Sequence, residues 1–282
     1  MYRFLFLLLS FLAQQLAAAQ VFISGSFDDL REKDLRFLEE ASKLGELTVF
    51  LWPDETIQNS TGKSPKFPLE ERLYLLNAVR YVSHVIVKPD LPLNGKFDIW
   101  ADRESPENSA HQAIALQSHI PYHVIPEIEL NIFPPIPPNC LDLTGHRKKV
   151  IVTGCFDWLH SGHVRFIEEC SSYGDLYVVI GNDPNIRLLK GEGHPLIPER
   201  ERFYAINSLK FQKQTLLAPG RGYLDSDSII RELMPDIFTV NEDGDKGGKL
   251  EYCQQLGIEY IVLKRLPALG LPVRSSTDLR GF

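Results

Sequence analysis

The sequence contains no long run of lysine or arginine, and its 37 acidic side chains outnumber its 30 basic ones. The formal net charge of -7 at pH 7 gives no general attraction to the phosphate backbone of a nucleic acid. We therefore expect no nucleic-acid partner. A small anionic substrate remains compatible with this composition, because a single pocket can be positive in an acidic protein.

Cysteine is also scarce in this chain of 282 residues. The four cysteines have no CxxC spacing: Cys140, Cys155, Cys170 and Cys253. This distribution argues against both a structural zinc site and a dense disulfide framework, and it leaves the redox state of the thiols open. With 44% hydrophobic residues, the chain has enough apolar material for one large domain or two ordinary ones.

Charged residues are absent from the apolar run at positions 4–13, which follows Arg3 and precedes an Ala-x-Ala pattern ending at Ala19. This pattern predicts a signal peptide over residues 1–19, which would direct the chain to the secretory pathway. A permanent membrane anchor is one alternative, although the run is short for a span and a strand pattern begins at Val21. A misassigned start is the other, and it would leave a cytoplasmic protein.

The chain repeats itself. Residues 21–54 align with residues 150–183 at a constant offset of 129, and fourteen of the 34 positions are identical. At an offset of 130, five residues of the first copy recur in the second: Pro68, Glu71, Arg72, Tyr74 and Asn77 match Pro198, Glu201, Arg202, Tyr204 and Asn207. At an offset of 138, four more recur: Asp98, Ile99, Ile120 and Tyr122 match Asp236, Ile237, Ile258 and Tyr260. We interpret the chain as two copies of one domain.

This repeat predicts four segments along the chain, namely the signal-like residues 1–19, a first repeat at 20–135, a linker at 136–148 and a second repeat at 149–282. The proline-rich stretch 134–138 is expected to be stiff and extended. The jump in offset is explained if the first copy lacks most of the helix that residues 225–233 predict in the second.

Short apolar runs alternate with amphipathic stretches in each copy. In the second copy the pattern predicts strands and helices at these positions: strands at 150–152, 176–180, 236–240 and 260–263, and helices at 163–173 and 199–210. Continuous apolar strands separated by helices predict a parallel sheet covered on both faces. Ligands bind such sheets beyond the carboxyl ends of the strands, where the strand order reverses.

The first strand of the second copy runs into the segment 154–163, which reads Gly-Cys-Phe-Asp-Trp-Leu-His-Ser-Gly-His. His160 and His163 are three residues apart, so they share one face at the start of the following helix. Free backbone N–H groups and the helix dipole favour a phosphate there, and Gly162 permits close approach. An HxxH pair can equally have a surface or structural role, and as a zinc site it lacks a third ligand at suitable spacing.

The pattern G-x-F-D-x-x-H-x-G-H after a strand resembles the signature of the cytidylyltransferase-like nucleotidyltransferase superfamily. Residues 274–280 resemble that family's Ser/Thr-rich signature before the last helix, and residues 187–195 resemble its flexible basic loop. Residues 198–202 resemble the start of the next helix. The resemblance spans almost all of 149–280 and implies an α/β fold with two tandem Rossmann-like nucleotidyltransferase domains, of which the first is degenerate.

In this family a phosphomonoester attacks the α-phosphate of a nucleoside triphosphate in line, and pyrophosphate leaves. The resemblance implies catalytic roles for His160 and His163 at the α- and β-phosphates, and for Lys190 at the triphosphate. The residues it implies for nucleotide binding come from the first turn and the C-terminal signature: Gly154, Cys155, Phe156, Asp157, Gly162, Arg265, Arg274, Ser275, Ser276 and Thr277. Mg²⁺ would arrive with the nucleotide, and no resident metal site is expected.

Simpler interpretations exist for several of these residues. Lys190 alone would pass for a solvated loop lysine, and the segment 275–277 for an ordinary helix cap. Cys155 is expected to pack rather than react, and Asp157 to hold the first turn. The combination of these patterns in one repeat favours phosphate binding.

The first copy departs from the signature. Three motif residues are replaced there: His160 by Arg31, Gly162 by Lys33 and His163 by Asp34. We predict that this copy is catalytically inactive and serves as the internal partner in a pseudo-dimer, because members of the family commonly pair such domains. Arg31 and Lys33 leave a regulatory anion site as an alternative. Further oligomerisation stays open.

The tandem arrangement resembles ethanolamine-phosphate cytidylyltransferase, which implies CTP and phosphoethanolamine as substrates in phospholipid biosynthesis. The loop 189–195 is instead closer to sugar-phosphate adenylyltransferases of the heptose type, which use ATP. We predict CTP with a small phosphorylated acceptor, and keep ATP with a sugar or polyol phosphate as the alternative. A non-catalytic nucleotide sensor or scaffold is the alternative of another class, suggested by the inactive copy and the signal-like segment.

Overall fold

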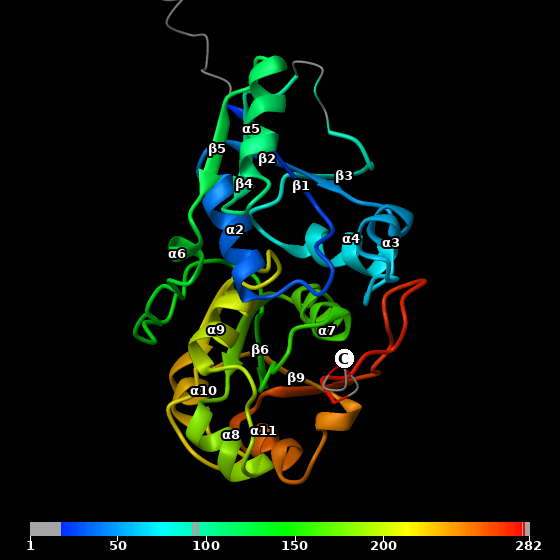
Figure 1. Cartoon of the computed structure of the whole chain (residues 1–282). Helices are drawn as coiled ribbons and strands as arrows, with labels where there is room; N and C mark the ends of the chain where they lie inside the picture. The colour runs from blue at the N-terminus through cyan, green and yellow to red at the C-terminus, as the bar shows by residue number, and fades with distance from the viewer. Residues whose placement is uncertain (1–17, 92, 94–95, 278, 280–282) are drawn as a thin grey trace, which may run out of the picture.

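The structure is a computed structural model that describes residues 18–91, 93, 96–277 and 279 (Figure 1). Almost all of the predicted signal segment, residues 1–17, lies outside these described residues. Within them, no helix is both long and apolar enough to cross a membrane.

The described chain folds into two five-stranded sheets whose strands are all parallel. The first sheet has the order β3-β2-β1-β4-β5 and contains β1 (Gln20–Gly25), β2 (Glu46–Leu51), β3 (His84–Val87), β4 (Ile99–Arg103) and β5 (Tyr122–Ile125). The second has the equivalent order β8-β7-β6-β9-β10 and contains β6 (Lys149–Gly154), β7 (Asp175–Ile180), β8 (Gln214–Leu217), β9 (Ile237–Asn241) and β10 (Glu259–Leu263). The predicted α/β fold in two tandem domains is confirmed.

Helices connect the strands in the same sequence in each half. In the first half they are α2 (Glu32–Ser42), α3 (Asp54–Thr61), α4 (Leu69–Ala78), α5 (Asn108–Gln117) and the short α6 (Glu127–Leu130). In the second half they are α7 (Ser161–Ser171), α8 (Asp183–Lys190), α9 (Glu199–Asn207), α10 (Asp227–Leu233) and α11 (Lys249–Leu256). Between β3 and β4 the described residues 88–91, 93 and 96–98 form no helix, whereas α10 lies between β8 and β9. This difference accounts for the jump in the repeat offset.

Each central strand is buried on both faces. Val150 and Val152 of β6 point into a large apolar core that also contains Val21 and Ile23 of β1, so this core is shared by the two halves. Ile151 points to the opposite face, where it packs with residues of α10 and α11. The continuous apolar runs of the sequence therefore reflect a sheet covered on both sides.

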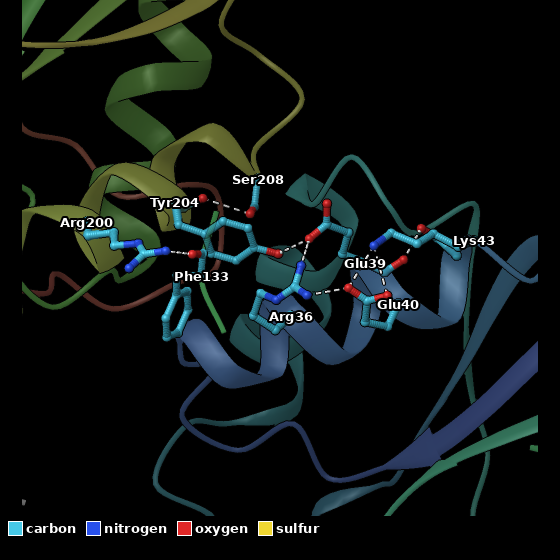
Figure 2. Close-up of polar contacts among 9 residues, drawn as sticks. Arg36, Glu39, Glu40, Lys43, Phe133, Arg200, Tyr204 and Ser208 are labelled. Carbon is cyan, nitrogen blue, oxygen red and sulfur yellow. Dashed lines mark hydrogen bonds and ion pairs between the residues drawn. The ribbon is translucent and has the colours of Figure 1, made fainter. Parts of the chain in front are cut away.

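The two halves contact each other through equivalent helices, because α2 packs against α9 and α4 packs against α7 (Figure 1). The hydroxyl of Tyr204 donates to Glu39 at 2.7 Å (Figure 2), and the hydroxyl of its counterpart Tyr74 donates to Glu168, the counterpart of Glu39, at 2.7 Å. Arg36 also binds Glu39 in this region. The same contact thus occurs twice, with the halves exchanged.

A short antiparallel bridge also joins the two halves. Val79 pairs with its own counterpart, Leu209. The N–H of Arg80 donates to Ser208 O at 2.9 Å, and the N–H of Lys210 donates to Ala78 O at 3.0 Å. The helix predicted to extend to residue 210 ends at Asn207, because the chain turns at Ser208 and Leu209 pairs with the other half.

Candidate functional site

A cavity of about 600 Å³ opens at the carboxyl ends of β6 and β9, where the strand order reverses. Eleven of the residues predicted for the site line it: Gly154, Cys155, Phe156, Asp157, His160, Gly162, His163, Lys190, Arg265, Ser276 and Thr277. The remaining two, Arg274 and Ser275, are not among its lining residues. The position agrees with the general location of ligands in open parallel sheets.

The turn after β6 is a preformed, strained loop. Phe156 and Trp158 have φ angles of 50° and 61°, which L-residues rarely adopt. The buried carboxylate of Asp157 accepts from Leu196 N at 2.9 Å and from Ile197 N at 3.0 Å. In the first half Asp28 accepts in the same way from Lys66 N at 2.7 Å. Because this bond recurs in a half without the histidines, the carboxylate of Asp157 is part of the fold of the turn.

The two histidines lie stacked at the start of α7. Their ring centroids are 3.9 Å apart and the rings are inclined by 22°. His160, only 1% exposed, is the N-cap of α7, and its Nδ1 accepts from Gly162 N at 3.1 Å. An accepting Nδ1 leaves the proton of the neutral ring on Nε2. A Cβ at position 162 would approach this ring to 3.0 Å, so glycine allows the packing.

His163 presents an unsatisfied polar atom. Its Nδ1 is buried and has no hydrogen-bond partner among the residues that the structure describes. Burial, together with the nearby His160, Arg265 and Lys190, holds the pKa of His163 well below the usual 6.5 of histidine. At neutral pH its ring is therefore uncharged, with one nitrogen able to donate to a ligand.

The N-termini of α2 and α7 differ in how their charge is balanced. The first turn of α2 contains Glu32 and Asp34, and the Asp34 carboxylate accepts from the backbone N–H of Arg31 at 2.7 Å. The first turn of α7 has no acidic residue. The first half thus supplies its own anion to this helix end, whereas the second half leaves the positive end of α7 facing the cavity.

The cavity is rich in positive charge although the whole protein is acidic. Four cationic side chains line it, together with two aspartates: Lys190, Lys246, Lys249 and Arg265, and Asp157 and Asp243. Burial lowers the pKa of Lys249. Lys190 is the last residue of helix α8 rather than part of the predicted flexible loop. Such a local excess of positive charge suits a polyanionic ligand.

Lys246 and Lys249 were not among the residues predicted from the sequence. Both residues follow β9 in the sequence. The only indication of their place was the general rule that residues beyond the carboxyl ends of central strands lie together at that edge of the sheet. Arg265, which was predicted, donates to Asp243 at 2.6 Å and to the carbonyl of Arg274 at 2.8 Å. Through these two bonds, Arg265 connects the C-terminal segment to the residues that follow β9.

The C-terminal signature contributes through Ser276 and Thr277. The Ser276 hydroxyl donates to the carbonyl of Asp157 at 2.5 Å, which holds this segment against the turn after β6. Leu279 N donates to Ser275 O at 3.3 Å, a helix-like spacing. The helix predicted beyond these residues falls largely on 278 and 280–282, which lie outside the described residues. Arg274 does not line the cavity, and its guanidinium binds Glu71 of the first half.

The two positive residues of the first half that could hold an anion, Arg31 and Lys33, are engaged with other side chains. Arg31 forms an ion pair with Asp29, and its guanidinium lies 4.0 Å from the ring centroid of Trp158 in the second half. Lys33 donates to Glu127 at 2.8 Å. A regulatory anion site in the first half would depend on the positive charge of Arg31 and Lys33. The carboxylates of Asp29 and Glu127 offset that charge.

A divalent cation would find few protein ligands at the cavity. Within residues 18–91, 93, 96–277 and 279, no three or more His, Cys, Asp or Glu side chains are grouped so that they could hold a metal ion. Asp157 is engaged by backbone N–H groups and Asp243 by Arg265. The donor set fits Mg²⁺ carried mainly by phosphate oxygens rather than by a protein cage.

The four cysteines are free, and burial raises the pKa of Cys155, so its thiol stays protonated.

The lowered pKa of His163 predicts a pH dependence of triphosphate binding. Bound phosphate would raise this pKa, so binding takes up a proton and affinity increases as pH falls through the pKa of the complex. Calorimetric titration between pH 8 and 6 should give a Kd that falls by at most about tenfold per pH unit. The variant His163→Gln is the control, because its pH dependence reports only titration of the nucleotide itself. An equal change of Kd with pH in the wild type and in this variant would contradict the expectation.

Comparison with known proteins identifies relatives of this chain. The model of the family described as Cytidylyltransferase-like matches residues 151–268, which include β6 to β10. An FAD synthase from Methanocella paludicola is 32% identical over 135 residues, covering 47% of this chain and 93% of that protein. The Bifunctional protein HldE of Desulfatibacillum aliphaticivorans is 38% identical over 117 residues, covering 40% of this chain.

The chain spans only 22% of the length of that HldE protein. Among solved structures, a lipopolysaccharide core biosynthesis protein from Thermoplasma volcanium GSS1 has 26% sequence identity and a TM-score of 0.36, and the match covers 43% of this chain and 98% of that one.

Proposed function

Because the chain belongs to the cytidylyltransferase-like family of nucleotidyltransferases, we propose that its second half transfers a nucleotidyl group from a nucleoside triphosphate to a small phosphomonoester and releases pyrophosphate. The observation that carries this proposal is the N-terminus of α7. Two stacked imidazoles adjoin the end of a helix whose own first turn has no acidic residue, beside a cavity lined by four cations. This arrangement suits a triphosphate.

In the proposed reaction, the acceptor's phosphate oxygen attacks the α-phosphate in line, and the bond from that phosphorus to the β-bridging oxygen breaks. His160 Nε2–H and the His163 ring would donate to the α-phosphate oxygens, on which charge grows in the transition state. Neither imidazole needs to exchange a proton with the reacting atoms. Catalysis then consists of positioning and electrostatic stabilisation.

Pyrophosphate is the leaving group, and the cations of the cavity would stabilise its charge. Lys190, Lys246 and Lys249 approach the cavity from α8 and from the chain after β9. Ser276 and Thr277 add hydroxyl donors from the C-terminal segment. Mg²⁺ bound with the nucleotide would supply further neutralisation of the phosphate charge.

We favour ATP as the nucleotide, with a sugar or polyol phosphate as the acceptor. The loop 189–195 resembles that of sugar-phosphate adenylyltransferases, and the FAD synthases among the relatives are named for a product that contains adenosine. CTP is the second candidate, supported by the tandem arrangement. The relatives compared above are not ethanolamine-phosphate cytidylyltransferases, so phosphoethanolamine and phospholipid biosynthesis lose support.

The first half would act as an internal partner, so that one chain forms a pseudo-dimer. The exchanged contacts of Tyr204 with Glu39 and of Tyr74 with Glu168 support this proposal, because equivalent surfaces meet across a two-fold axis in symmetric dimers. The first half has an aspartate, Asp34, at the position of His163, which supports an inactive copy.

Pyrophosphate release tests the proposed function. The full chain is incubated with Mg²⁺ and either ATP or CTP, each against a panel of phosphomonoesters that includes hexose phosphates, heptose phosphates, glycerol phosphate, phosphoethanolamine and FMN. We expect release with ATP and one sugar or polyol phosphate, at a rate at least about tenfold above that with CTP. Tight nucleotide binding without release for any pair would contradict the proposal and support the sensor.

A further inference from the structure

Glu71 of the first half reaches both sequence motifs of the second half. It lies on α4, and its side chain is 0% exposed. Glu71 Oε1 accepts at 2.6 Å from the hydroxyl of Ser161, which lies in the segment 154–163 that contains both histidines. Glu71 Oε2 accepts from Nη2 of Arg274, the first residue of the C-terminal signature, at 2.8 Å. One carboxylate therefore joins two segments that are more than one hundred residues apart in the sequence.

The ion pair between Arg274 and Glu71 holds both side chains in a defined geometry. Arg274 Nε also lies 3.1 Å from Glu71 Oε2, so the guanidinium binds through two nitrogens. Its Cζ lies 5.0 Å from the ring centroid of Phe67, also in the first half. A buried carboxylate that loses its cation is strongly destabilised, which favours a single arrangement of these groups.

The symmetry of the interface provides an internal comparison. The counterpart of Glu71 is Glu201, and the counterpart of Ser161 is Glu32. There two carboxylates approach each other, and burial together with Glu201 raises the pKa of Glu32. The helices α2 and α9 nevertheless pack as α7 and α4 do. The link from Glu71 to Ser161 and Arg274 is therefore not required for packing of the helices.

Further bonds connect this link to the cavity. The carbonyl of Arg274 accepts from Arg265 at 2.8 Å, and Arg265 lines the cavity. Two residues later, Ser276 donates to the carbonyl of Asp157 at 2.5 Å. Fixing Arg274 therefore restricts Arg265, Ser276 and Thr277 together.

The geometry points to Glu71 as a positioning residue for the nucleotide site, supplied by the half that lacks the histidines. By binding Ser161 and Arg274 together, Glu71 holds the C-terminal signature against the N-terminus of α7. This inference rests on the proposed function of the second half. It assigns the first half a direct part in the geometry of the site.

Substitution of Glu71 should separate nucleotide binding from acceptor binding. In the full chain, Glu71→Gln keeps the size of the side chain but removes the charge that holds Arg274. We expect the KM for the nucleotide and its Kd, measured by calorimetry, to rise about tenfold, and the KM for the acceptor to stay within about twofold. The matched control Glu201→Gln lies at the symmetric position and should leave all three constants unchanged.

A second pair of variants guards against a general folding defect. If Glu71 acts through Arg274, the double variant of Glu71→Gln and Arg274→Gln should bind nucleotide no more weakly than Arg274→Gln alone. Thermal unfolding of each variant reports stability separately.

Three results would overturn the inference: an unchanged nucleotide Kd in Glu71→Gln, an equal defect in Glu201→Gln, or additive defects in the double variant. If the wild-type chain binds nucleotide but shows no turnover, the proposed function fails. The inference about Glu71 is still tested in that case, because the nucleotide Kd of each variant can be measured without turnover.

Discussion

Replacement of His163 by alanine should lower kcat by about a hundredfold or more, with the fold retained. The ring lies at the start of α7, stacked on His160, and its buried Nδ1 has no hydrogen-bond partner among the described residues. Removal of this donor leaves charge on the α-phosphate without a preorganised partner. Pyrophosphate release at saturating nucleotide and acceptor measures the effect directly.

The fold itself does not require a histidine at this position. The first half has Asp34 there, at the same place in the equivalent helix α2. The unfolding midpoint of His163→Ala should therefore stay close to that of the wild type. His146→Ala, in the exposed segment before β6, is the matched control and should retain full activity. A kcat within about twofold of wild type for His163→Ala would exclude a catalytic role.

Replacement of Arg202 by alanine should reduce the free energy of unfolding by about 3 to 5 kcal/mol. The side chain is 0% exposed. Its guanidinium donates to four acceptors: Ile197 O at 2.9 Å, Cys155 O at 2.6 Å, Gly181 O at 2.9 Å and Asp183 Oδ1 at 2.6 Å. Loss of these bonds leaves three carbonyls without their donor and the turn after β6 without its support. Denaturation with urea measures the change.

Two controls distinguish this effect from a general loss of positive charge. Arg221→Ala removes an exposed arginine of the same half and should change the unfolding free energy by less than about 0.5 kcal/mol. Arg202→Lys should recover only part of the loss, because an ammonium group cannot reproduce the planar arrangement of donors. Equal stability of Arg202→Ala and Arg221→Ala would show that the buried bonds contribute nothing.

Arg72 shows that this arrangement belongs to the fold. In the first half it donates to Phe67 O at 3.0 Å, to Ser26 O at 2.6 Å and to Trp52 O at 3.0 Å. The two halves therefore share the buried arginine and the aspartate in the turn after their first strand. They differ at the positions of the two histidines. Comparison within one chain separates residues that maintain the fold from those we assign to chemistry.

Much of the fold was predictable because its signals are local or repeated. The apolar run at the start of the second copy predicted a strand at 150–152, and β6 occupies 149–154. The repeat offsets predicted an equivalent order of elements in both halves, and the missing helix explained the jump in offset. Helix α7 begins at Ser161, two residues before the predicted start, because the ring of His160 caps the first turn.

The predicted site was incomplete for a physical reason. Arg274 was assigned to the nucleotide from its place in the C-terminal signature, but its guanidinium binds a carboxylate 203 residues away in sequence. No local pattern reveals such a pair. Lys246 and Lys249 were missed because isolated lysines resemble solvated surface residues, and only the sheet brings them to the cavity.

The pairing of α2 with α9 and of α4 with α7 has a consequence for molecularity. Two separate chains would have to meet in solution, so their association would depend on concentration. Here residues 131–148, between α6 and β6, tether one half to the other, and association becomes intramolecular at a high effective concentration. Covalent linkage also removes any requirement that the two surfaces stay identical. One half can then specialise in supporting its neighbour, which equivalence in a homodimer would not permit.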